Sequence, residues 1–79
     1  MIERESAQMG LRAHELLLEV DKPVYKQLRE MGLGKNLNCG WAEGVCAPSS
    51  KALRAMALAG YDVMYILTGV RSKEAGYGN

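Results

Sequence analysis

The fold of this chain is decided by two stretches, WAEG at residues 41–44 and GYDVMYILTG at residues 60–69, with APS at residues 47–49 between them. Glycine at the end of each short apolar segment is typical of a helix end, because glycine tolerates the left-handed conformation needed there. Asp62 is placed to cap a helix whose inward residues are Val63, Ile66 and Leu67. These stretches predict short helices separated by glycine turns.

The N-terminal third predicts one longer helix. Its inward positions recur at spacings of three and four, which indicates a single buried stripe: Ile2, Ser6, Met9, Ala13, Leu16 and Val20. Gly10 within it costs about 1 kcal/mol relative to alanine, so the first turns are expected to fray. The segment 21–23 ends this helix, and Pro23 suits the first position of the next one.

Three more helix boundaries follow from the same signals. A second helix runs to about Met31, and the turn at residues 32–34 separates it from a third helix over about residues 35–43. A fourth begins near residues 48–50. The expected inward residues are Val24, Leu28 and Met31 in the second helix and Ala52, Leu53, Met56 and Ala57 in the fourth. The prediction is an all-α, compact five-helix domain over residues 1–69, followed by a mobile tail at 70–79.

Composition narrows the class of protein. Seventy-nine residues suffice for one small domain, and 48% of them are apolar, which excludes a disordered chain. No apolar run approaches 18 residues and no secretory signal opens the chain, so we expect a soluble, cytoplasmic protein without a membrane span. Cys39 and Cys46 with the single His14 make no zinc-ligand set, so we expect no metal and no cofactor. Free thiols are expected, and a disulfide or redox switch stays open.

The sequence shows no Ser/His/Asp or Cys/His arrangement for nucleophilic catalysis, so it does not predict an enzyme. Charge is unevenly distributed: the net charge is −3 over residues 1–21, +4 over 22–54 and zero over 55–79. A basic middle segment favours a phosphate-facing surface, although an ordinary solvated face would look the same.

In this order, several motifs resemble the phage-type Cro/CI (XRE) family of helix-turn-helix repressors. The resemblance covers residues 9–71 and rests on MGLGKN at 31–36, WAEG at 41–44, PS at 48–49 followed by KAL at 51–53, and the stretch 60–69. It implies a lambda-repressor-like fold and a transcriptional regulator of phage or prophage origin. Such a protein would bind operator DNA as a homodimer in a bacterial cytoplasm, associated with the nucleoid when bound.

The chain departs from the family pattern where DNA reading is expected. Leu28 replaces a small residue before the turn, Asn38 replaces an apolar residue, Gly40 replaces a polar base-reading residue, and Val24 replaces a glutamine. A roll of the third helix would bury Leu37 and Trp41 and place Asn38 on its flank. These departures keep a second hypothesis open: a protein-binding module, such as a small phage-encoded inhibitor of a host regulator or enzyme. A dimerising fragment of a longer repressor is a third.

The resemblance places the DNA contacts at the start of the third helix. Lys35 can donate to guanine and Asn36 can form two bonds with adenine, and Asn38 is a third candidate if the helix rolls. Three lysines near predicted helix N-termini are candidates for phosphate contacts: Lys22, Lys26 and Lys51. Met64 and Tyr65 are the expected dimer surface, with covering the edge of the core as their alternative role.

Overall fold

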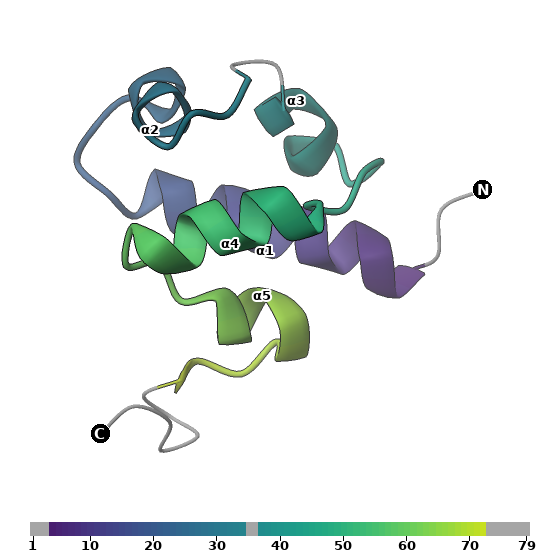
Figure 1. The fold of residues 1–79 in the computed structure, drawn as a ribbon. Coiled ribbons are helices and arrows are strands. Elements are labelled where there is room, and N and C mark those ends of the chain that lie inside the picture. Colours follow the sequence, from purple (N-terminus) through teal and green to yellow (C-terminus); the bar gives the residue numbers. More distant parts are fainter. Residues whose placement is uncertain (1–3, 35–36, 73–79) are drawn as a thin grey trace.

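The computed structural model describes residues 4–34 and 37–72, and within them it confirms an all-helical fold without strands. The helices are α1 (Arg4–Leu18), α2 (Val24–Glu30), α3 (Leu37–Ala42), α4 (Ser50–Leu58) and α5 (Val63–Thr68). In Figure 1, α1 and α4 cross the middle of the molecule, α2 and α3 lie together above them, and α5 lies below. The helix pair joined by the glycine turn and the closing helix therefore occupy opposite sides.

One apolar core joins the five helices. Helix α1 contacts α2, α3 and α5, and it contributes the central side chains. The buried apolar residues are Ala13, Leu16, Leu17, Leu28, Leu33, Trp41, Ala52, Met56 and Ile66. Leu28 on α2 is fully buried. The leucine that stands where the Cro/CI pattern has a small residue therefore belongs to the core.

Three helices end on the same backbone motif, at the glycines that the sequence analysis selected. After α2, Gly32 has a positive φ of 74°, and the Leu33 N–H donates to the Leu28 carbonyl at 2.8 Å. Leu33 and Leu28 are both buried, which is the apolar contact that accompanies this closure. The same closure recurs after α3 at Gly44 and after α4 at Gly60.

Side-chain caps start the last two helices. The Ser49 hydroxyl accepts from the Ala52 N–H at 3.2 Å, and Asp62 accepts from the Tyr65 N–H at 3.2 Å. The predicted Asp62 cap is therefore confirmed. Pro23 lies one position before α2 and not at its first residue, as its ψ of 139° requires.

Some residues predicted to face inward are exposed: Val20, Leu37, Ala57 and Leu67. Helix α1 ends at Leu18, so Val20 no longer follows the helical periodicity, and Leu17 is buried beside Leu16 instead. Helix α5 has six residues, of which Ile66 is buried, while Val63 and Tyr65 pack against the core from partly buried positions. Of the three residues expected to face inward from α5, Leu67 is therefore the one that does not.

The chain directly after α5 contacts α1 through Arg71, and the mobility of residues 70–79 stays a prediction. The Arg71 guanidinium lies 2.6 Å from Glu19 and 3.3 Å from Glu15, and it stacks over the Tyr65 ring with 4.1 Å to the centroid. Residues 73–79 lie outside the described residues. The two ion pairs join the chain after α5 to α1, which lies 52 to 56 residues earlier in the sequence.

Acidification should release this segment. The Ser72 hydroxyl and N–H hold the pKa of Asp62 below its usual range, and the Arg71 guanidinium does the same for Glu19. Because these pKa values are lowered by folding, the stabilisation is complete above the unfolded values of 3.8 and 4.5 and is lost as the pH falls through the folded values.

The amide signal of Ser72, followed by NMR on acidification, should move toward its unfolded position over that window. An Asp62→Asn variant keeps a capping side chain but loses the titrating carboxylate, so the part of the shift due to Asp62 should vanish. A Ser72 signal that follows the same acid curve in both proteins would contradict the assigned contact.

Candidate nucleic-acid interface

Helix α3 is anchored to the core by Trp41. This side chain is fully buried, in agreement with its predicted role in packing. Leu37, which was expected to be buried with it, is 40% exposed because it lies one turn earlier, at the open end of α3. Lys35 and Asn36, the two leading candidates for base contacts, lie outside the described residues.

Asn38 faces the interior of the protein. Its side-chain carbonyl oxygen lies 2.5 Å from Nδ1 of His14 on α1, and both residues are half-buried. A bidentate contact with adenine uses both the oxygen and the NH₂ group of an asparagine, and here the oxygen already contacts His14. In this arrangement Asn38 links α3 to α1, and its role in reading bases stays a prediction.

Close packing against Cys46 explains why position 40 has no side chain. A Cβ at this position would lie 2.5 Å from Sγ and 3.1 Å from Cβ of Cys46, so this face of α3 is covered by the following loop. The Cro/CI pattern has a polar base-reading side chain where this chain has Gly40. A larger side chain at position 40 would have to displace the Cys46 side chain.

Among the candidate lysines, Lys22 differs from the other two. Its ammonium forms an ion pair with Glu30 at 2.7 Å, which raises the pKa of Lys22. Lys26 and Lys51 are exposed, and neither forms an ion pair within residues 4–34 and 37–72. The structure thus leaves Lys26 and Lys51 available to an anionic partner.

Two arginines that the sequence analysis counted only as charge extend this set. Arg29 lies three residues after Lys26 on α2, and Arg54 lies three residues after Lys51 on α4. Residues at this spacing share a helix face, and both arginines are exposed. Each helix therefore carries one exposed basic pair, and the spacing was the signal that could have identified them.

No family model matches this chain, and no curated protein and no solved structure matches it. The resemblance to Cro/CI repressors accordingly stays a prediction from the motifs.

An apolar hollow of about 690 Å³ opens beside α3. Its lining residues are Gly34, Leu37, Gly40, Trp41, Cys46, Ala47 and Ser49. Both cysteines, Cys39 and Cys46, are free thiols in the structure. The surface next to the α2–α3 turn is thus apolar around Leu37, while the exposed basic pairs lie on α2 and α4.

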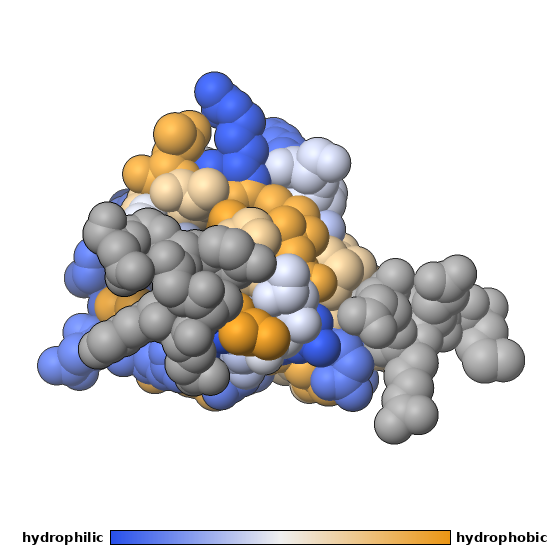
Figure 2. All heavy atoms as spheres, turned by 90° about the horizontal axis from the view of Figure 1, so that it is seen from below, coloured by the Kyte–Doolittle hydropathy of each residue, from blue (hydrophilic) through white to orange (hydrophobic). Residues whose placement is uncertain are grey.

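The predicted dimer residues lie on α5, on the side opposite α2 and α3. Tyr65 is half-buried: its ring packs on the core and under Arg71, and its hydroxyl donates to Glu15. Met64 is also half-buried, whereas Leu67 is exposed. Figure 2 views the molecule from the α5 side and shows apolar side chains exposed there among charged ones.

The part of the chain that the structure describes holds no cluster of metal ligands. Its His, Cys, Asp and Glu residues form no group of three that could hold a metal ion. None of its helices is long and apolar enough to cross a membrane.

Proposed function

We propose that this chain is a sequence-specific DNA-binding regulator that places α2, the glycine turn and α3 against duplex DNA. The observation that carries the proposal is the presence of two exposed basic pairs, Lys26 with Arg29 on α2 and Lys51 with Arg54 on α4. Side chains of this kind contribute affinity by neutralising phosphates and releasing counterions. The closed turn at Gly32 supports the proposal, because it joins two short helices on one side of the core.

Contacts with the DNA backbone and contacts with the bases would come from different residues, as in helix-turn-helix proteins. The basic pairs contact the backbone, and Lys35 and Asn36 read base edges in the major groove. A homodimer that binds an operator would place two such helices about 34 Å apart, on successive turns of the DNA. This activity belongs in the bacterial cytoplasm, with the phage or prophage origin that the motifs suggest.

Paired variants test the phosphate contacts. Replacing Lys26 and Arg29 by alanine should weaken binding to all duplexes alike and reduce the salt slope, d log K/d log[salt], by about 2. Fluorescence anisotropy with a duplex selected from random sequences gives both quantities. The matched control is Lys22→Ala, because Lys22 is already paired with Glu30 and should contribute little. Equal losses in the two proteins would contradict the assignment.

The base contacts need a separate variant. Replacing Lys35 and Asn36 by alanine should remove the preference for the selected duplex over a scrambled one while leaving general duplex affinity largely in place. Retention of the full preference would exclude these residues as readers.

The apolar hollow beside α3 favours a second candidate function, docking on a host protein. An exposed leucine at the start of α3 suits a protein surface better than a phosphate backbone. Under this alternative, Leu37→Asp abolishes partner capture, and the alanine replacements at Lys26 and Arg29 leave it intact. Duplex binding with the salt dependence expected above would instead favour the regulator.

A further inference from the structure

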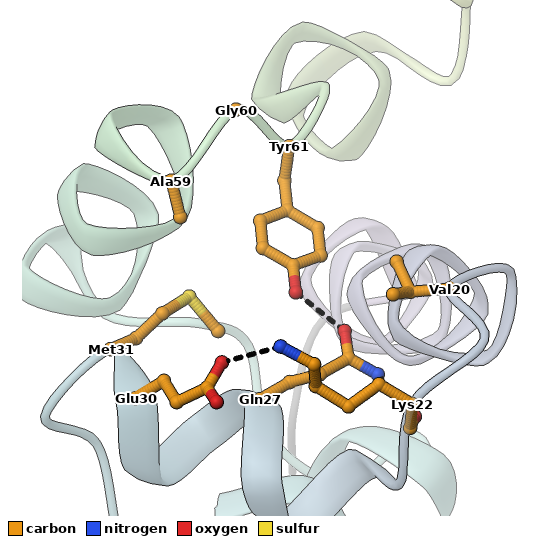
Figure 3. A pocket seen from close by; sticks show the side chains of 8 residues that line it. All are labelled: Val20, Lys22, Gln27, Glu30, Met31, Ala59, Gly60 and Tyr61. Carbon is orange, nitrogen blue, oxygen red and sulfur yellow. Dashed lines mark hydrogen bonds and ion pairs between the residues drawn. The ribbon is translucent and has the colours of Figure 1, made fainter.

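A second pocket lies between α2, with the loop before it, and the turn that joins α4 to α5 (Figure 3). Its volume is about 330 Å³, at the lower end of the range for small-molecule sites. The residues that line it are Val20, Lys22, Gln27, Glu30, Met31, Ala59, Gly60 and Tyr61. None of the DNA contacts proposed above uses this pocket.

Opposite charges lie side by side in the pocket. Lys22 Nζ and Glu30 Oε1 are 2.7 Å apart, and both side chains are substantially exposed, 42% and 58% respectively. Figure 3 shows them facing each other across the pocket. Exposed ion pairs contribute little to stability, so a ligand that supplies a cation to Glu30 and an anion to Lys22 can separate them at small cost.

The floor of the pocket presents acceptors. Gln27 is 2% exposed, and its NH₂ group donates to the carbonyls of Leu17 and Lys22, both at 2.8 Å. The Tyr61 hydroxyl donates to Gln27 Oε1, and burial raises the pKa of Tyr61, which keeps that hydroxyl protonated. Because these protons already take part in hydrogen bonds, Gln27 Oε1 and the Tyr61 hydroxyl oxygen can each accept one further hydrogen bond. Such a floor suits an ammonium group.

The walls are apolar. Val20, Met31 and Ala59 border the pocket from the end of α1, the end of α2 and the end of α4. Val20 is exposed and takes no part in the core, so its place in the pocket wall is its main packing role. A ligand with a short apolar body would cover these side chains and remove them from water.

We propose that this pocket binds a small zwitterion, namely a free α-amino acid with an apolar side chain. The ammonium group bonds to Glu30 and the floor oxygens, the carboxylate bonds to Lys22, and the side chain packs on Val20, Met31 and Ala59. The neighbouring opposite charges, the hydrogen-bond acceptors of the floor and the apolar walls together match the groups of such an amino acid. The proposal does not depend on DNA binding.

Titration with leucine, followed by NMR, tests the proposal. Leucine at up to about 20 mM, well above a Kd of about 1 mM, should give saturable shifts of the Gly60 and Tyr61 amides and of the Gln27 side-chain NH₂. N-acetyl-leucine lacks the ammonium and leucinamide lacks the carboxylate, and each should bind at least about tenfold more weakly. Absence of saturable shifts, or equal binding of leucinamide and leucine, overturns the proposal.

Matched variants locate the charges. Glu30→Gln and Lys22→Met should each weaken leucine binding at least about tenfold. Glu43→Gln and Lys51→Met change the same residue types at exposed positions outside the pocket and should leave the affinity unchanged. Because the native ion pair is exposed, all four proteins should stay folded, which the dispersion of the NMR spectrum checks. Equal affinity of the pocket variants and their controls overturns the assignment.

Discussion

Gly10→Ala should destabilise the fold by about 2 kcal/mol, although alanine is the better helix former by about 1 kcal/mol. A Cβ at this position would lie 2.2 Å from the carbonyl oxygen of Cys46 and 3.2 Å from Cα of Trp41. Both atoms belong to the backbone, so no side-chain rotation can relieve the overlap. Either α1 or the loop after α3 must move, and α1 and α3 form a large part of the core.

Urea denaturation of the variant measures this effect directly. Gly34→Ala is the matched control, because among the described residues no atom beyond its chain neighbours lies within 4 Å of a Cβ at this position. Its expected effect lies between zero and a gain of about 1 kcal/mol, from reduced freedom of the unfolded chain. A Gly10→Ala protein as stable as the wild type would contradict the close approach of α1 to Cys46.

Gln27→Leu should cost about 2 kcal/mol in the free energy of unfolding. An unsatisfied buried polar group costs about 1–3 kcal/mol, and of the three hydrogen bonds lost only the one to the Leu17 carbonyl is fully buried. The side chain satisfies the carbonyls of Leu17 and Lys22 and accepts the hydroxyl proton of Tyr61. Leucine fills a similar volume, so the loss would reflect missing hydrogen bonds and not a cavity. This one amide joins α1, the following loop, α2 and the turn before α5.

Gln8→Leu provides the control, since Gln8 is exposed on α1. Its unfolding free energy should change by no more than about 0.5 kcal/mol. A loss below about 1 kcal/mol for Gln27→Leu would mean that the amide network is not needed to join these helices.

The features that could be predicted from sequence are those set by neighbouring residues. Helix ends at Gly32, Gly44 and Gly60 and the cap at Asp62 depend on backbone conformation within a few residues. Helix periodicity also placed the main core residues correctly. It failed at Val20 because α1 ends at Leu18. It also failed at three residues that lie within their helices but on exposed faces: Leu37, Ala57 and Leu67.

The features that were missed depend on contacts between distant segments. Gly10 is needed because residue 46 crosses it, and Gln27 is buried because residue 61 reaches it. The spacing of residues along the chain does not show that residue 46 lies near Gly10 or that residue 61 lies near Gln27. For the candidate site, the spacing of Arg29 and Arg54 after the two lysines was visible, whereas the pairing of Lys22 with Glu30 required the turn before α2.

The salt dependence of duplex binding by the wild-type chain tests the proposed function most directly. Four exposed basic side chains lie on α2 and α4: Lys26, Arg29, Lys51 and Arg54. If each neutralises one phosphate, log K should fall linearly with log[salt] with a slope of about −3.6 per chain. No duplex binding near physiological ionic strength, or a slope near zero, would contradict the proposal that these helices face DNA.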